Sequence, residues 1–99
     1  MTTVTLIGKP DCHLCEVAHG VVVQVVAELP GKVAEGVEVV EKSIAEDAEL
    51  FAKWWEKIPV VLIDDRLHAH WRVAPDRLHD ALLDAARTAG AAEFTGPVR

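Results

Sequence analysis

The first third of the chain carries two hydrophobic patterns, one typical of a strand and one typical of a helix. Residues 3–7 form a short β-branched and apolar run that ends at Gly8, which predicts a buried strand followed by a turn. Across residues 14–29 apolar side chains recur at helical spacing, and a Pro-Gly pair supplies the stop. The stretch 20–26 is rich in β-branched residues and alone would also suit a strand, but the length of the periodic run favours a helix. The residues of this apolar stripe are Leu14, Ala18, Val21, Val22, Val25 and Leu29.

The middle of the chain predicts a second strand and a second helix. After a loop through Gly36, residues 37–42 alternate well enough to form a strand. Ser43 ends this strand, and with Glu46 three residues later it fits a capping box, which predicts a helix that opens here and runs toward Trp55. Helical spacing places one of the two adjacent tryptophans in the core and leaves the other partly exposed. The expected apolar face consists of Ile44, Ala48, Phe51 and Trp55.

The last third predicts two strands and a helix. Residues 59–63 are a near-continuous apolar run, typical of a central strand buried on both faces. Two aspartates turn the chain, and residues 67–73 then alternate strictly, so this segment should return antiparallel with one face covered. Pro75 suits the first position of a last helix that runs to Gly90, and residues 91–99 are expected to form a flexible tail. The inward stripe of that helix is expected to be Leu78, Leu82, Ala85 and Ala89.

The order of these elements predicts an α/β fold in a single domain. A chain of 99 residues is long enough for one hydrophobic core and too short for two. The order strand, helix, strand, helix, strand, strand, helix implies a right-handed crossover. We therefore expect a four-stranded mixed sheet with helices on both of its faces.

Charge and hydrophobicity restrict the classes of binding partner and the cellular compartment that we expect. The formal net charge of -6 repels phosphate backbones and anionic lipid surfaces, so we expect neither a nucleic acid nor a membrane as partner. The N-terminus lacks the features of a secretory signal, and no apolar stretch approaches the length of a membrane span, which predicts a cytoplasmic protein. In a reducing cytoplasm, a close pair of cysteines is more typical of catalysis or metal binding than of a structural disulfide.

The two cysteines, Cys12 and Cys15, stand at the predicted junction between the first strand and the first helix. A thiol at a helix N-terminus meets free amides and the helix dipole, which stabilise a thiolate, so Cys12 is the expected nucleophile. Cys15 is expected one helical turn further in, where it can attack a mixed disulfide on Cys12 and release the product. Lys9 and His13 are candidates for lowering the pKa of Cys12 through positive charge, although both also suit an ordinary surface role.

Two segments resemble the glutaredoxin-like branch of the thioredoxin superfamily. Residues 9–15, Lys-Pro-Asp-Cys-His-Leu-Cys, look like the active-site stretch of that family. Residues 57–60, Lys-Ile-Pro-Val, look like its segment with a cis-proline opposite the cysteines. The resemblance implies a thioredoxin-like fold, a cis bond between Ile58 and Pro59, and an Ile58 backbone that is presented to a substrate.

The segment before the last predicted helix departs from the family pattern. Relatives that bind glutathione carry a Gly-Gly turn followed by an acidic residue, whereas this chain has Val73, Ala74, Pro75 and Asp76. The resemblance implies a substrate-binding role for Asp76. Side chains at Val73 and Ala74 would crowd the backbone of a tripeptide, so we expect glutathione to bind weakly.

These features together predict a thiol-disulfide oxidoreductase that works by dithiol exchange in the manner of a glutaredoxin. The expected partner is a disulfide-bearing protein or a low-molecular-weight thiol. The reductant stays open between glutathione, another small thiol and thioredoxin reductase. We expect a monomer that uses no cofactor and no metal.

Two alternatives use the same residues differently. The chain could be a thioredoxin-fold binding or scaffold module with idle cysteines, or the two cysteines could hold a metal or an iron-sulfur cluster. His68 and His70 share a face of the predicted strand and are suitable ligand types. His68 is expected to lie far from Cys12, however, and exposed histidines on a half-solvated strand are the simpler interpretation.

Overall fold

The computed structural model describes the backbone of residues 2–93 and the side chains of residues 2–87. The elements follow the predicted order, except that a short helix stands where the sequence predicts a loop before Gly36. No helix within this described part is both long and apolar enough to cross a membrane. In chain order the elements are β1 (Thr2–Gly8), α1 (His13–Glu28), α2 (Gly31–Glu35), β2 (Val37–Ser43), α3 (Ala48–Trp54), β3 (Val60–Ile63), β4 (Arg66–His70) and α4 (Pro75–Glu93).

The four strands form one mixed sheet in the order β2-β1-β3-β4, which confirms the predicted sheet. The edge strand β2 runs parallel to β1, whereas β3 runs antiparallel to both β1 and β4. The parallel register places Leu6 opposite Glu41, and the antiparallel register places Ile7 opposite Val60. The end of β1 that leads to the cysteines therefore lies between the end of β2 and the start of β3.

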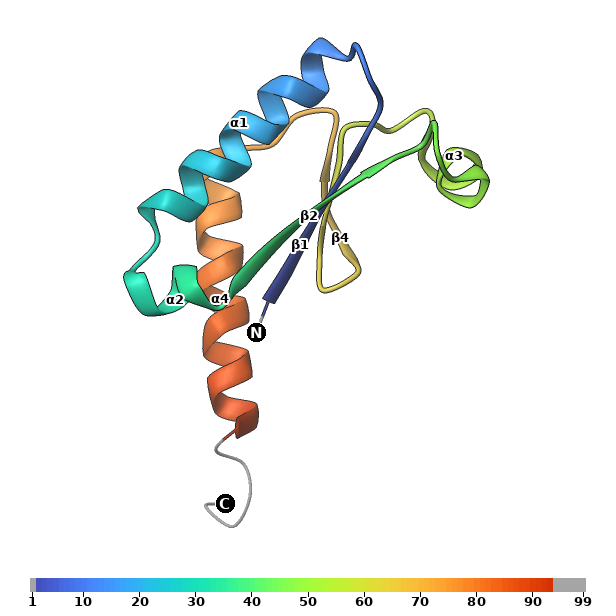
Figure 1. The fold of residues 1–99 in the computed structure, drawn as a ribbon. Helices are drawn as coiled ribbons and strands as arrows, with labels where there is room; N and C mark the ends of the chain where they lie inside the picture. The colour runs from blue at the N-terminus through green and yellow to red at the C-terminus, as the bar shows by residue number, and fades with distance from the viewer. Residues whose placement is uncertain (1, 94–99) are drawn as a thin grey trace.

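Helices cover both faces of the sheet, as predicted. Figure 1 shows α1 and α4 side by side on one face and α3 on the other. The larger core cluster joins α1 and α4 to the sheet, and a smaller cluster lies beneath α3. The larger cluster contains Val4, Leu6, Ala18, Val22, Val25, Leu29, Val61, Val73, Leu78 and Leu82, and the smaller contains Ile7, Ile44, Trp54, Val60 and Leu62.

The predicted first helix is confirmed, with one correction at its start. Ala18, Val22 and Val25 are buried against the sheet, as the periodic pattern indicates. Leu14 belongs to the predicted apolar stripe, but 48% of its surface is exposed. Leu14 lies in the first turn of α1, which does not bury it, so this part of the predicted stripe is wrong.

The predicted start of the second helix is wrong. Ser43 remains in β2, paired with Gly8, and its hydroxyl accepts a hydrogen bond from the backbone of Ala45 at 3.1 Å. Helix α3 begins later, where the Asp47 carboxylate accepts from the N–H groups of Glu49 and Leu50 at 2.9 and 3.1 Å. Pairing in the sheet holds the serine in the strand and leaves the aspartate as the cap.

The later start of α3 also changes its buried face. Trp54 is buried and Leu50 packs against the small core cluster, whereas Phe51 and Trp55 are about half exposed. These two aromatic rings stack on the surface with their centroids 6.1 Å apart. The predicted apolar face through Phe51 and Trp55 is therefore wrong, while the prediction of one buried and one exposed tryptophan is confirmed.

The turn after β3 agrees with the prediction, whereas β4 and α4 differ from their predicted lengths. Asp64 and Asp65 form the predicted turn with positive φ angles. Strand β4 is shorter than predicted, because Trp71 adopts a φ of 66° and leaves the strand. Helix α4 continues to Glu93, into the segment predicted as a tail, and residues 94–99 lie outside the described residues.

Candidate functional site

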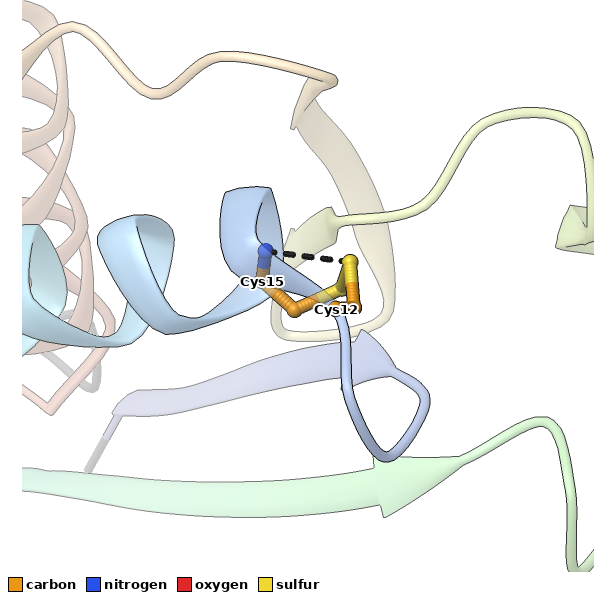
Figure 2. Close-up of a disulfide and its surroundings, with 2 residues drawn as sticks. All are labelled: Cys12 and Cys15. Carbon is orange, nitrogen blue, oxygen red and sulfur yellow. Dashed lines mark hydrogen bonds between the residues drawn. A yellow bond between two sulfur atoms is a disulfide. The ribbon is translucent and has the colours of Figure 1, made fainter.

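The two cysteines lie at the N-terminus of α1, directly after the loop that follows β1. Asp11 turns this loop with a φ of 58°, a left-handed conformation that aspartate adopts more readily than most residues. Cys12 and Cys15 form a disulfide, with their Cα atoms 5.2 Å apart (Figure 2). The strand-to-helix junction thus brings the pair together within one helical turn.

Cys12 is the N-cap of α1, and its sulfur meets the helix backbone. The N–H of Cys15 donates to Cys12 Sγ at 3.2 Å, the contact drawn as a dashed line in Figure 2. The Cys12 carbonyl accepts from the N–H of Glu16 at 3.1 Å, which closes the first turn. Once the disulfide is opened, a thiolate on Cys12 would face this amide and the positive end of the helix dipole.

The two sulfurs differ in their access to solvent. Cys12 is half-buried at the rim of the site, whereas Cys15 is only 9% exposed. Gly8, at the end of β1, makes room for Cys15: a Cβ added there would lie 2.9 Å from Cys15 Sγ and 3.1 Å from Cys15 Cβ. A side chain at Gly8 would therefore collide with the buried cysteine.

A cleft of about 600 Å³ opens beside the disulfide, on the side of the edge strand β2. Both cysteines and Gly8 form part of its wall. Its other lining includes side chains from the β1–α1 loop, from α1, and from the end of β2 and the turn after it. We call it the charged cleft, after the lining residues Lys9, Asp11, Glu16, His19, Glu41, Lys42 and Glu46.

Gly8, His19 and Glu41 are among the residues of the charged cleft that are absent from the predicted site. His19 lies on α1 and Glu41 on β2, and their side chains approach to 3.6 Å between His19 Nε2 and Glu41 Oε2. The spacing of four residues between Cys15 and His19 was the available sequence signal, because such positions share a helix face. Gly8 and Glu41 depend on which strands lie beside the cysteines, and no local pattern indicates that.

Of the residues predicted to tune the thiolate, Lys9 lines the charged cleft and His13 does not. Both side chains are exposed. Lys9 shares the cleft wall with Cys12, while His13 is the first residue of α1. Their effect on the Cys12 thiol stays a prediction.

The Ile58–Pro59 segment lies at the same end of the two central strands as the cysteine loop. Because Ile7 pairs with Val60, this segment comes just before the start of β3 and beside the end of β1. The Ile58–Pro59 peptide bond is cis, Pro59 is buried, and Ile58 is half-buried. The Pro59 carbonyl accepts from the N–H of Trp71 at 2.9 Å, which joins this segment to the end of β4.

A second hollow, of about 310 Å³, lies on the other side of α1. Trp71 forms part of its wall, and the Trp71 indole N–H donates to the carbonyl of Glu56 at 2.8 Å. Trp71 is 56% exposed, and Leu14 and Val17 on α1 are about half exposed. We call this hollow the apolar groove; it is lined by Leu14, Val17, Ala18, Val21, Trp71, Arg72 and Val73.

The segment before α4 presents its side chains in different directions. Val73 is buried in the larger core cluster, and Ala74 is exposed. Ala74 is therefore the more accessible of the two side chains, while Val73 also forms part of the wall of the apolar groove. Asp76 is exposed in the first turn of α4, where a carboxylate suits the helix dipole.

The histidines of β4 are not grouped with the cysteines in the described part of the structure. His68 and His70 are both half-buried. Burial, with the charge of Arg77 as a second cause, lowers the pKa of His68 below its ordinary value. Within the part of the chain that the structure describes, no three histidine, cysteine or acidic side chains are grouped as metal ligands.

Comparison with known proteins decides the family. The family model of the glutaredoxin-like domain (DUF836) matches residues 3–83. The chain belongs to this family. The assignment confirms the resemblance that the cysteine motif and the Ile58–Pro59 segment indicate. No curated protein sequence matches this glutaredoxin-like protein.

Solved structures place the glutaredoxin-like protein in the thioredoxin fold. It is similar to a mutant thioredoxin from Halobacterium salinarum NRC-1, with a TM-score of 0.59 and 14% identity over 84% of this chain and 73% of that one. It is also similar to the oxidized mitochondrial thioredoxin 3 from Saccharomyces cerevisiae, with a TM-score of 0.57 and 14% identity over 84% and 77% of the two chains. The predicted thioredoxin-like fold is confirmed.

Proposed function

We propose that this glutaredoxin-like protein is a thiol-disulfide oxidoreductase that works by dithiol exchange through Cys12 and Cys15. One observation carries the proposal: the two cysteines form a disulfide at the N-terminus of a long helix. In that disulfide Cys12 is the more accessible cysteine, and its Sγ accepts a hydrogen bond from a helix N–H, whereas Cys15 is shielded. This asymmetry suits one nucleophilic and one resolving thiol.

The reaction proceeds in two exchanges of sulfur bonds. In the reduced protein the Cys12 thiolate attacks one sulfur of a substrate disulfide, a bond forms between them, and the other substrate sulfur leaves as a thiolate. Cys15, after losing its proton, then attacks Cys12 Sγ and expels the second substrate sulfur. The substrate gains two electrons, and the protein gains the Cys12–Cys15 disulfide, which an external thiol must reduce.

The remaining predicted residues have supporting roles in this proposal. Lys9 and His13 favour the Cys12 thiolate through positive charge when protonated. Ile58 and Pro59 lie just before the central strand β3, at the end of the sheet where the cysteine loop lies, and the Ile58 backbone would pair there with an extended substrate. Asp76 binds a polar group of the substrate from the first turn of α4.

The proposed substrates are disulfide-bearing proteins or low-molecular-weight thiols in their oxidised form. We propose weak binding of glutathione, because Ala74 projects into solvent where glutathione-binding relatives carry glycine. The proposal further takes the protein to be a monomer of the cytoplasm, where small thiols keep the active-site pair reduced.

Trapping of the intermediate tests the proposal directly. Cys15→Ser should leave the first exchange intact and accumulate substrates as mixed disulfides on Cys12, because no internal thiol can release them. Cys12→Ser should trap nothing, because Cys15 is too enclosed to attack a substrate. Capture of Cys15→Ser from cells, compared on reducing and non-reducing gels, measures the adducts.

Each alternative gives a different outcome in this experiment. A scaffold with idle cysteines yields no reductant-sensitive adducts from either variant. A metal site yields equal loss of metal from both variants, measured by elemental analysis. Equal bands from Cys12→Ser and Cys15→Ser, or absence of disulfide reductase activity with every thiol donor tried, would overturn the proposed function.

A further inference from the structure

The charged cleft contains a histidine and a glutamate for which the exchange described above has no use. His19 lies four residues after Cys15 in α1, and residues at this spacing share a helix face with their Cβ atoms about 5–6 Å apart. Glu41 reaches His19 from β2, with Glu41 Oε2 3.6 Å from His19 Nε2. Both side chains line the same cleft as Cys15. An imidazole within ion-pair distance of a carboxylate thus lies one helical turn from the resolving cysteine.

The resolving step requires a group that takes a proton from Cys15. Only a thiolate attacks a disulfide, and a free cysteine has an ordinary pKa of about 8.5, so at neutral pH most of it is protonated. Burial further disfavours the charged form of a thiol, and Cys15 is 9% exposed. Cys15 forms part of the wall of the charged cleft, as His19 does. A proton that leaves Cys15 therefore leaves on the side where His19 stands.

We propose that His19 accepts the proton of the Cys15 thiol in the resolving step and that Glu41 is the positioning residue for its imidazole. The proposal rests on the dithiol exchange proposed above. The S–H bond of Cys15 breaks and the proton passes to neutral His19. The sulfur electron pair forms the bond to Cys12 Sγ, and the bond between Cys12 and the substrate breaks, so that the substrate thiolate leaves with the electron pair. The carboxylate of Glu41 stabilises the imidazolium that results.

Other charged groups surround His19 in the cleft. Glu16 lies on the same helix, Lys9 and Asp11 on the β1–α1 loop, and Lys42 and Glu46 at the end of β2 and in the turn after it. Three carboxylates besides Glu41 thus stand against two lysines, so the cleft around His19 holds charges of both signs. Of all these types of side chain, only histidine has an ordinary pKa, about 6.5, near neutral pH, so it can both accept and return a proton.

A two-phase reaction separates the roles of the two cysteines in one experiment. The reduced protein is mixed with an equimolar amount of the aromatic disulfide dithiobis(nitrobenzoate), whose released thiolate is coloured. Attack by Cys12 releases the first coloured thiolate, and attack by Cys15 on the mixed disulfide releases the second. Stopped-flow absorbance over a range of pH yields the rate of each phase. The leaving thiolate needs no proton, so the second phase reports the deprotonation of Cys15.

In the wild-type protein the second phase should rise at a lower pH than the range in which an ordinary thiol ionises, because His19 takes up the Cys15 proton. His19→Asn should slow this phase about tenfold at neutral pH and shift its rise toward the ordinary thiol range, about pH 8.5, without slowing the first phase. Glu41→Gln should slow the second phase by a smaller factor, about twofold to fivefold, because it removes the support of the imidazole and leaves the imidazole in place.

Two matched variants serve as controls. His79→Asn removes a histidine on α4 that does not line the cleft, and Glu38→Gln removes the same charge from β2 outside the cleft. Both should retain the wild-type profile of the second phase. A second phase in His19→Asn with the wild-type rate and pH profile overturns the proposal. Absence of the first phase in the wild-type protein overturns the proposed function instead, so the two failures are distinguishable.

Discussion

The charged cleft and the apolar groove lie against different faces of the same helix. Cys12, Cys15, Glu16 and His19 border the cleft, and each is three or four residues from two of the others, whereas Leu14, Val17, Ala18 and Val21 border the groove. The cleft adjoins β2, and the groove adjoins the segment after β4. The first turns of α1 thus separate two surfaces. The charged cleft includes the shielded Cys15, and the apolar groove does not.

One residue in each hollow carries the contrast further. Gly8 in the cleft has no positive φ angle, so its backbone does not need a glycine, but the space beside Cys15 does. Trp71 in the groove has a φ of 66°, a conformation that favours glycine, yet the position holds the largest side chain. The cleft therefore depends on the missing side chain of Gly8. The groove depends on the large side chain of Trp71, whose backbone conformation is unfavourable for any residue with a Cβ.

The largest effect is expected from Gly8→Ala. The added Cβ would lie 2.9 Å from Cys15 Sγ, which the disulfide holds in place. Overpacking of this kind costs about 1–3 kcal/mol. The contact with Cys15 Cβ at 3.1 Å is present in both redox forms, but the contact with Sγ should add a further cost in the oxidised protein, because the free thiol of the reduced protein can turn away. Denaturant unfolding of both forms, and equilibration with a dithiol buffer, should show a lower stability of the oxidised form and a shift toward the dithiol.

Gly20→Ala is the matched control for this substitution. Gly20 lies within α1, and a Cβ there has nothing within 4 Å. The same chemical change should therefore stabilise both redox forms equally, by about 0.5–1 kcal/mol, because alanine suits a helix interior better than glycine. If Gly8→Ala lowered the stability of both forms to the same extent, the contact with Cys15 Sγ would not contribute to the loss.

The second effect concerns the backbone of Trp71. Its N–H donates to the Pro59 carbonyl at 2.9 Å and its indole to Glu56, and these bonds hold the left-handed conformation. Trp71→Ala removes the ring but keeps the cost of a Cβ at positive φ, whereas Trp71→Gly removes both. Trp71→Gly should therefore be more stable than Trp71→Ala by about 1 kcal/mol, measured by thermal unfolding. An alanine variant as stable as the glycine variant would show that the backbone is not strained there.

The sequence predicts the fold well because the decisive patterns are local. The alternation in β2, the continuous apolar run of β3 and the helical stripe of α1 each specify an element without reference to its neighbours. The start of α3 could not be predicted in this way. Ser43 and Asp47 are both suitable caps, and the pairing of Ser43 with Gly8 in the sheet selects Asp47.

The residues of the candidate site likewise differ in whether a local sequence pattern indicates them. Cys12 and Cys15 could be predicted because a pair at a strand-to-helix junction is a local signal. The partner of His19 could not, because Glu41 reaches it only through the parallel register that places Glu41 beside Leu6. The room that Gly8 leaves for Cys15 likewise depends on the angle at which α1 leaves the sheet, which no periodicity encodes.

The smallest effect is a pH dependence of stability that must be separated from the proposed pH dependence at His19. Burial, followed by the charge of Arg77, lowers the pKa of His68 on β4. Between the ordinary value of about 6.5 and the lowered value in the folded protein, the unfolded chain binds more protons. Stability should therefore be fully present above the ordinary value and should decline as the pH falls through the pKa of the folded state.

His68→Gln, which carries no titrating group, should flatten the decline in melting temperature on acidification. Because His68 lines neither the charged cleft nor the apolar groove, the same variant should keep the wild-type pH profile of the second exchange phase. His19→Asn should do the reverse, since the exposed pair with Glu41 contributes little to stability and the exchange depends on its imidazole. If His68→Gln altered the exchange profile as His19→Asn does, the pH dependence would come from partial unfolding, and the assignment of the proton to the charged cleft would be wrong.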